Sequence, residues 1–276
     1  MKKIFVLITV LLFILGGCGQ ANKETDNGTA QNNSKEEVTL KVASLIPPMT
    51  EILEKLVKPK LAEESINLEV VVLSDNVQPN SALAAKEVDA NFFQHVPYMQ
   101  QFNSNNNAEL VPIVPIYFAN YGVYAKEYDS MDELPDGAVI AIANDISNID
   151  RSLTLLAQHN AIKLQEKTDT YYTLADIIDN PKNFKFAEVD LLMLARMYDD
   201  ADAVVMTPAY AAPLGLTPKS DALLTEGTEN DFAITLVARK DNADWEPIQK
   251  LAEAMTSPEV RKFLEENYDE TAIPAF

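Results

Sequence analysis

From residue 38 to residue 268 the chain alternates regularly between two kinds of segment. Short apolar runs are typical of buried strands, and they alternate with segments whose apolar residues recur at helical spacing. Strands are predicted over residues 38–43, 68–73, 90–93, 139–142, 184–189, 203–206 and 232–238. Helices are predicted over residues 49–63, 80–86, 97–102, 150–159, 191–198, 247–255 and 258–268. Because such alternation forms mainly parallel sheets covered by helices on both faces, the predicted fold class is α/β.

The alternation occurs in two blocks, residues 38 to about 120 and about 125 to 230. The extended segments Tyr117–Ala125 and Phe232–Ala238 could cross between the blocks. We therefore predict two mainly parallel sheets in two lobes, with residues 38–120 and 235–276 in lobe 1, residues 121–234 in lobe 2, and two crossing segments as a hinge. Ligands of open α/β sheets bind beyond the carboxyl ends of strands, so residues that follow Ala90, Ile142 and Met206 are the first site candidates.

The N-terminal segment has the organisation of an export signal. Lys2 and Lys3 precede an apolar run over residues 4–15, and the run ends just before Cys18. Twelve helical residues span roughly 18 Å, less than the ~30 Å core of a bilayer, which predicts a signal peptide over residues 1–17. Residues 19–37 are polar and predict a tether of roughly 25 Å. Gly16 and Gly17 before the only cysteine resemble a bacterial lipobox, which implies that Cys18 carries two acyl chains that anchor the chain outside the cytoplasm.

Composition and missing motifs exclude several classes of function. The 42 acidic residues outnumber the 22 basic ones, and a net charge of −20 argues against a nucleic-acid partner. A single cysteine excludes an internal disulfide and a zinc site built from cysteines. The sequence has no phosphate-binding glycine loop, nucleophile elbow, zinc-protease motif or calcium loop, so we expect no enzyme activity, metal or cofactor. His159, which follows a predicted helix beside polar neighbours, is expected at the surface.

Two clusters follow predicted strands and are candidates for a binding site. The first runs from Asn91 to His95 and continues to Tyr98, and its aromatic rings fit either core packing or a ligand wall. The second runs from Ala143 to Arg151 at the start of a helix. A helix N-terminus attracts anions and an arginine adds a fork for a carboxylate. The alternative is that Asn148 or Asp150 only caps the helix and that Arg151 is solvated.

Several longer stretches together resemble the methionine-binding lipoproteins of the MetQ/NlpA family, the solute receptors of ABC importers. These stretches are Asp75–Asn80 with Ala82 and Leu83, Asp89–Tyr98 (DANFFQHVPY), Ser130–Gly137 (SMDELPDG), Ala141–Arg151, Asn180–Phe186 (NPKNFKF), Asp199–Ala203 (DDADA) and Ile273–Phe276. The resemblance covers nearly the whole mature chain. It implies a type II periplasmic-binding-protein fold with a cleft that closes on a free amino acid.

The resemblance also implies roles for individual residues. Arg151, with Asn144 and Asn148, matches residues that hold the carboxylate and polar backbone groups of the ligand. Three ring-bearing residues match the wall around a thioether side chain: Phe93, His95 and Tyr98. This division is chemically coherent, because a zwitterion that leaves water needs paired charges and a polarizable sulfur gains from contact with ring edges.

Two departures from the family pattern bear on the ligand. The family usually has Asn-Gly-Asn-Tyr-Ala where this chain has residues 207–211 (TPAYA), so Thr207 and Ala209 replace two amides. Each lost hydrogen bond is typically worth ~0.5–1.5 kcal/mol. Residues 117–122 (YFANYG) replace a histidine-containing stretch that ends in Pro-Met-Gly. Tyr121 and Thr207 could compensate, and with Tyr210 they complete the predicted ligand-binding set.

These observations favour a lipid-anchored receptor that binds methionine or a related amino acid. We expect it to act as a monomer that delivers the ligand to an ABC permease and its ATPase, and to catalyse no reaction. Another amino acid or a methionine-containing dipeptide remains open as the ligand. Two other classes also remain open: a secreted hydrolase that uses His95 with an acidic residue, and an interaction lipoprotein whose cleft is vestigial.

Overall fold

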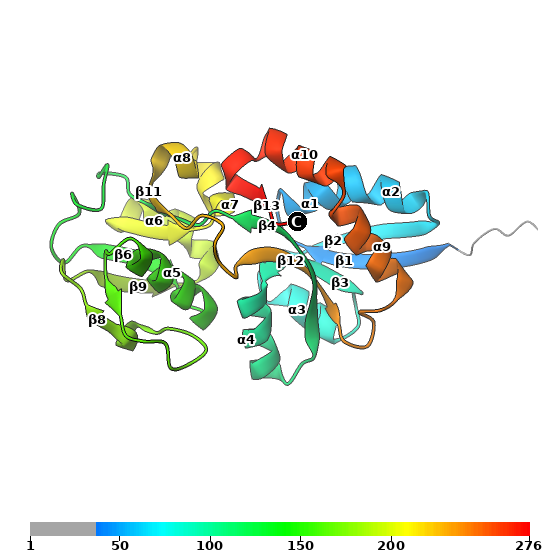
Figure 1. Cartoon of the computed structure of the whole chain (residues 1–276), viewed down its shortest axis with the longest axis horizontal. Helices are drawn as coiled ribbons and strands as arrows, with labels where there is room; N and C mark the ends of the chain where they lie inside the picture. The colour runs from blue at the N-terminus through cyan, green and yellow to red at the C-terminus, as the bar shows by residue number, and fades with distance from the viewer. Residues whose placement is uncertain (1–36) are drawn as a thin grey trace, which may run out of the picture. The chain divides into compact units, whose positions relative to one another are not determined.

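Residues 37–276, which a computed structural model describes, form two main β-sheets with helices on both faces of each (Figure 1). The α/β fold class is therefore confirmed. The predicted signal peptide, Cys18 and the predicted tether up to residue 36 lie outside the described residues. Within residues 37–276, no helix has both the length and the apolar character needed to cross a bilayer.

The first sheet has six strands in the spatial order β13–β4–β12–β3–β1–β2. Their bounds in that order are Ala272–Pro274, Leu110–Ala119, Ala233–Arg239, Ala90–His95, Val38–Ser44 and Ile66–Val72. The helical segments around it are α1 (Met49–Glu51), η1 (Ile52–Val57), α2 (Lys58–Ala62), α3 (Gln78–Ala84), α4 (Val96–Asn106), α9 (Glu246–Met255), α10 (Pro258–Asn267) and η5 (Asp269–Thr271). Leu40 and Val42 of β1 face η1, α2, α9 and α10, whereas Ala43 faces α3 and α4.

The second sheet has five strands in the order β11–β5–β10–β6–β9. Their bounds in that order are Ala222–Thr225, Gly122–Tyr124, Ala203–Met206, Val139–Ala143 and Lys185–Val189. The helical segments of this part are α5 (Ile146–Gln158), η2 (Leu174–Asp176), η3 (Leu191–Met193), α6 (Leu194–Asp200), α7 (Pro208–Ala211), η4 (Ala212–Leu214) and α8 (Pro218–Asp221). A two-stranded sheet of β7 (Lys163–Leu164) and β8 (Ile177–Asp179) follows α5.

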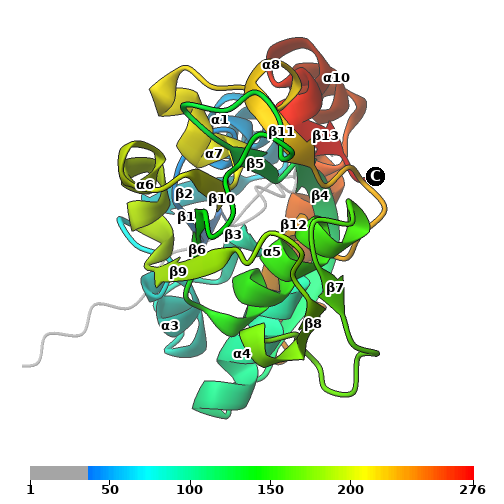
Figure 2. The ribbon, with the colours of Figure 1, turned by 90° about the vertical axis from the view of Figure 1, so that its left-hand side faces the viewer.

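Strand β6 shows why the second sheet is covered on both faces. Successive side chains of a strand point to opposite faces, so an uninterrupted apolar run is buried on both. Ile140 and Ile142 pack with residues of α5, whereas Ala141 and Ala143 pack with Leu194 of α6. Figure 2 shows α5 and α6 on opposite sides of this sheet.

Both sheets are mixed, whereas mainly parallel sheets were predicted. The pairs β1·β2, β1·β3, β6·β9 and β6·β10 are parallel, as predicted. The strands next to the connections between the sheets are antiparallel, as in β12·β3, β12·β4, β10·β5 and β11·β5. The sheets are therefore parallel where helices connect the strands and antiparallel where the chain passes from one sheet to the other.

The chain passes between the sheets twice, at Asn120 and Tyr121 and again at residues 226–232. The crossing predicted at Phe232–Ala238 is wrong in its placement, because nearly all of that segment is strand β12 of the first sheet. The two true crossings are bonded to each other: the Gly227 amide donates to Asn120 Oδ1 at 3.0 Å, and the Glu226 amide donates to the Tyr121 carbonyl at 2.9 Å. The lobe boundaries at 120/121 and 234/235 stay a prediction.

Candidate binding site

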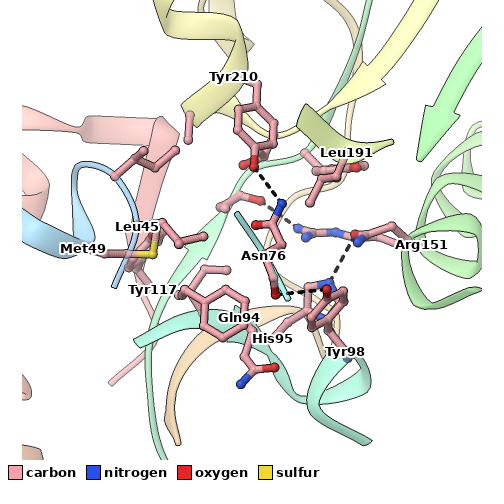
Figure 3. A pocket seen from close by; sticks show the side chains of 18 residues that line it. Leu45, Met49, Asn76, Gln94, His95, Tyr98, Tyr117, Arg151, Leu191 and Tyr210 are labelled. Carbon is pink, nitrogen blue, oxygen red and sulfur yellow. Dashed lines mark hydrogen bonds between the residues drawn. The ribbon is translucent and has the colours of Figure 1, made fainter. Parts of the chain in front are cut away.

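One cavity lies where the carboxyl ends of strands from both sheets meet (Figure 3). It is lined by Leu45, Ile46, Met49, Asn76, Phe93, Gln94, His95, Tyr98, Tyr117, Ala119, Tyr121, Asn148, Arg151, Leu191, Thr207, Ala209, Tyr210 and Ile234. These residues follow or end β1, β2, β3, β6, β9 and β10, or belong to β4, β12 and the first crossing. Figure 3 shows Arg151 entering from one side and Leu45 and Met49 on the opposite side. The cavity therefore has a cationic side and an apolar side.

The aromatic wall is built at the end of β3 and the start of α4. The rings of Phe93 and Tyr98 meet edge to face with centroids 6.0 Å apart, and the His95 ring lies 6.2 Å from Tyr98 in the same arrangement. The Tyr98 hydroxyl donates to the Asn76 carbonyl at 3.2 Å, which ties the wall to the loop after β2. Edge-to-face contacts fix ring orientation, so the wall has its shape before a ligand arrives.

A buried amide network holds the end of β3 in place. Gln94 Oε1 accepts from Asn80 Nδ2 at 2.7 Å, and Gln94 Nε2 donates to Asn91 Oδ1 at 2.9 Å. Asn91 Nδ2 in turn donates to Asn80 Oδ1 at 2.9 Å. All three side chains are buried, and buried amides are stabilising only when they are paired in this way. The network fixes the backbone that carries Phe93 and His95.

His95 joins the two sides of the cavity as a neutral side chain. Its Nδ1 accepts from the Tyr98 amide at 3.2 Å, so Nε2 carries the proton and donates to Asn148 Oδ1 at 3.2 Å. Burial, with the nearby Arg151 charge, lowers the pKa of His95 to about 3. A neutral histidine with both nitrogens engaged is a poor acid or base at neutral pH, and no Asp or Glu of the described residues 37–276 lines the cavity. The hydrolase hypothesis has no catalytic pair in this cavity.

Helix α5 presents Asn148 and Arg151 to the cavity. The helix begins earlier than predicted, at Ile146, and Asp145 is its N-cap: the Asp145 carboxylate accepts from the Asn148 amide at 3.1 Å and from Asn148 Nδ2 at 2.8 Å. The alternative that Asn148 or Asp150 caps the helix is therefore wrong. Arg151 is buried rather than solvated, at 2% exposure.

The Arg151 guanidinium is held by both crossings between the sheets. Its Nη2 lies 2.6 Å from Glu226 Oε2 and donates to the Ala119 carbonyl at 2.8 Å, while Nε donates to Glu226 Oε1 at 2.9 Å. The rings of Tyr121 and Phe232 lie 4.2 and 4.9 Å from the guanidinium carbon. Within residues 37–276 the third nitrogen, Nη1, has no hydrogen-bond partner. One nitrogen thus remains for an anion in the cavity.

The structure brings eight of the nine predicted ligand-binding residues to this cavity. They are Phe93, His95, Tyr98, Tyr121, Asn148, Arg151, Thr207 and Tyr210. Asn144 is the exception: it is exposed, does not line the cavity, and its amide donates to the Val189 carbonyl at 2.8 Å. His159 is exposed, as predicted.

Sequence reasoning missed part of the cavity. Leu45, Met49 and Asn76 follow the ends of β1 and β2, so the rule that pointed to residues after Ala90, Ile142 and Met206 could have found them. No sequence pattern pointed to Glu226 as part of the site. It lies in an irregular segment 75 positions from Arg151, and only the folded chain brings the two together.

Comparison with known proteins decides the family. A protein-family model described as NlpA lipoprotein matches residues 40–276. The chain belongs to the NlpA lipoprotein family. As a family member it is similar to the methionine-binding lipoprotein MetQ of Bacillus subtilis, with 37% identity over an alignment of 281 positions that covers 99% of each chain. The predicted family resemblance is confirmed.

Solved structures agree with this assignment. A nutrient-binding protein from Burkholderia cenocepacia, solved bound to methionine, is 34% identical and has a TM-score of 0.82, with 86% of this chain and all of that chain covered. A periplasmic substrate-binding protein of an ABC transporter from Coxiella burnetii is 34% identical with a TM-score of 0.80, over 86% of this chain and all of that one.

The comparisons confirm the periplasmic-binding-protein fold for this NlpA family member. They also identify it as a binding protein rather than an enzyme, and as an extracytoplasmic lipoprotein anchored to a membrane. The lipid attachment itself, predicted at Cys18, lies outside the described residues.

Proposed function

We propose that the chain is the receptor of an ABC importer and that it encloses one amino acid with an apolar side chain, methionine first among the candidates, in the cavity between the two sheets. The proposal draws on the family and on the relatives that are named for methionine or were solved with it. The ligand is held without chemical change and passed to a permease that is driven by an ATPase. We propose that the receptor acts as a monomer.

One observation carries the proposal: the cavity has a guanidinium on one side and apolar side chains on the other. Arg151 Nη1 offers hydrogen bonds to a carboxylate, and charged hydrogen bonds of this kind are the strong ones. Leu45, Met49 and the ring of Phe93 offer contacts to an apolar side chain. A thioether suits this wall because sulfur gains from contact with aromatic ring edges.

The remaining polar groups suit the rest of the ligand backbone. Asn76, Asn148 and Thr207 line the cavity with amide and hydroxyl oxygens that can accept from an ammonium group. Thr207 stands where the family usually has an asparagine, so in this proposal its hydroxyl takes over one of the two lost amide contacts. Ala209 offers no replacement for the other.

Capture depends on contacts that join the two sides of the cavity. His95 bonds to Asn148, Asn76 Nδ2 lies 3.5 Å from the Tyr210 hydroxyl, and the Tyr171 hydroxyl donates to the Pro97 carbonyl at 2.8 Å. Each contact joins a segment on the side of the first sheet to one on the side of the second: β3 to α5, the loop after β2 to α7, and α4 to the loop before η2. A ligand that touches both sides favours this closed arrangement over an open one, and the closed form is the one a permease would receive.

The test is a ligand panel measured by thermal unfolding and calorimetry on the mature chain without its lipid. Methionine, norleucine, leucine, glutamate and lysine are compared. We expect methionine and norleucine to raise the unfolding temperature by mass action and the two charged side chains to have no effect. A panel without any shift, together with no calorimetric heat for methionine, would overturn the proposal.

A longer ligand is a second candidate because a second cavity adjoins the first. It shares Ile46, Tyr117, Ala119, Thr207 and Ala209 with the first cavity and extends to Pro47, Pro48, Pro208, Ala212, Pro213, Tyr268 and Thr271. The second cavity has a volume of about 910 Å³, against about 600 Å³ for the first. This space favours a methionine-containing dipeptide whose second residue lies beyond Ala209.

Ala212→Phe separates the two candidates, because Ala212 lines only the second cavity. For a dipeptide ligand, the larger side chain should weaken dipeptide binding by at least about tenfold while methionine affinity stays within about twofold. A dipeptide affinity that does not change in this variant would contradict the second candidate.

A further inference from the structure

The buried carboxylate of Glu226 sits directly behind the cation of the binding cavity. Glu226 begins the second crossing, and its side chain is 4% exposed, against 3% for Arg151. Its two oxygens accept from Arg151 Nε and Nη2, and its own amide donates to the Tyr121 carbonyl. Backbone and side chain therefore both hold the carboxylate in place.

Glu226 decides the net charge of the cavity. Within residues 37–276, Arg151 is the only cation that lines the cavity, no Asp or Glu lines it, and His95 is neutral. The other carboxylates near α5 are accounted for: Asp145 is partly exposed at the helix N-terminus, and Asp150 pairs with Lys167 at 2.6 Å. Glu226 therefore cancels the charge of Arg151. Asp145, Asp190 and Asp75 lie farther out, where their charges raise the pKa of Tyr98 but do not pair with Arg151.

A ligand carboxylate would become the second anion on one guanidinium. Glu226 occupies the Nε and Nη2 edge and leaves Nη1 for the ligand. Two carboxylates around one guanidinium leave one net negative charge in a buried site, and an uncompensated buried charge is costly. An ammonium group on the same ligand removes that charge.

We propose that Glu226 makes the cavity selective for zwitterions: by neutralising Arg151 it favours an amino acid over the same carboxylic acid without its ammonium group. This inference rests on the proposed function. Glu226 acts through Arg151 rather than by touching the ligand, so its effect is on selectivity and differs from that of a residue that only supports the fold. Glu226→Gln leaves the guanidinium with an amide partner and gives the cavity a net positive charge.

The experiment compares two ligands by calorimetry: methionine, and methylthiobutanoate, which is methionine without its amino group. The measured quantity is the ratio of the two Kd values, methylthiobutanoate over methionine. We expect this ratio to fall by at least about tenfold in Glu226→Gln, chiefly through tighter binding of methylthiobutanoate. Glu226→Asp keeps the charge and should keep the ratio within about threefold of the unmodified chain.

Glu229→Gln is the matched control, since Glu229 is an exposed carboxylate of the same segment. It should leave both Kd values unchanged. If the unmodified chain binds methionine and Glu226→Gln leaves the ratio within about threefold, the inference is overturned while the proposed function stands. If the unmodified chain binds neither ligand, the proposed function is overturned and the inference with it.

A second variant covers the case in which Glu226→Gln does not fold. The double variant Arg151→Gln with Glu226→Gln removes both charges and leaves the cavity neutral. Its affinity for both ligands should fall, and the ratio should stay within about threefold of the unmodified chain. A ratio that moves by about tenfold or more toward methylthiobutanoate in this neutral cavity would overturn the inference.

Discussion

The buried histidine of the cavity predicts how stability responds to mild acid. His95 is 4% exposed and neutral, and burial with the charge of Arg151 lowers its pKa from 6.5 to about 3. In the unfolded chain the same side chain takes up a proton near its ordinary pKa of about 6.5. Below that pH the unfolded state therefore binds one proton that the folded state does not, and stability falls as the pH falls toward about 3.

The size of this effect follows from the two pKa values. Between pH 7 and pH 5 the unfolded histidine changes from mostly neutral to almost fully protonated, while the folded one stays neutral. Linkage then gives a loss of about 2 kcal/mol in the free energy of unfolding from His95 alone. A loss of this size is a large share of the 5–15 kcal/mol that is typical of a folded domain, taken as an order of magnitude.

Urea unfolding at pH 7 and pH 5 measures the loss. The informative variant is His95→Gln, whose amide cannot titrate but can still donate to Asn148. The stability of this variant at pH 7 is not the readout, because it also loses ring contacts with Tyr98 and Phe232. The readout is the difference between the two pH values, which should be about 2 kcal/mol smaller than in the unmodified chain.

His159→Gln is the control, since His159 is exposed and is the only other histidine of the sequence. It should lose stability between pH 7 and pH 5 to the same extent as the unmodified chain. If His95→Gln and His159→Gln respond to pH alike, His95 does not stay neutral in the folded protein and the reasoning fails.

Two further predictions concern the cavity wall. The hydroxyls of Tyr121 and Tyr124 are buried without a partner among residues 37–276, so each Phe variant should raise the free energy of unfolding by up to about 1 kcal/mol, measured by urea unfolding. Only Tyr121→Phe should weaken methionine binding in calorimetry, because Tyr124 does not line the cavity. Equal effects of the two variants on methionine binding would contradict this prediction. Arg151→Ala should weaken methionine binding by at least about tenfold and destabilise the fold by about 3–5 kcal/mol, because it leaves Glu226 buried without its partner. The exposed Arg196 provides the control, and an Arg151→Ala variant that binds as well as Arg196→Ala would remove the guanidinium from the site.

Strong local patterns made most of the fold predictable. Apolar runs such as residues 139–142 and 203–206 form buried strands β6 and β10, since such runs have few other stable placements. Strand β4 was not predicted; only its last three residues fell within the extended crossing segment predicted at Tyr117–Ala125. Pro112 and Pro115 argue against a strand, but they lie where β4 pairs with β12 alone, and the register with β12 shifts next to them. Prolines are tolerated at such edges and bulges.

The site was predictable in its position and only partly in its contacts. Phe93 lies near the end of β3, Tyr98 and Asn148 follow the ends of β3 and β6, and the sheet topology brings those ends together. Pairing across long sequence distance was not predictable. Arg151 was predicted to hold the ligand carboxylate, and no protein partner was predicted for it, whereas Glu226 from the second crossing occupies two of its nitrogens. No local pattern encodes that partnership, since it exists only once the two sheets are in place.

Native mass spectrometry of the mature chain, purified without added ligand and again after incubation with methionine, tests the central claim most directly. The account predicts one small zwitterion bound to each chain, identified by fragmentation after release, and its loss in the Arg151→Ala variant. A chain that carries no small molecule in either preparation, or one that retains it equally without the Arg151 guanidinium, would contradict the account.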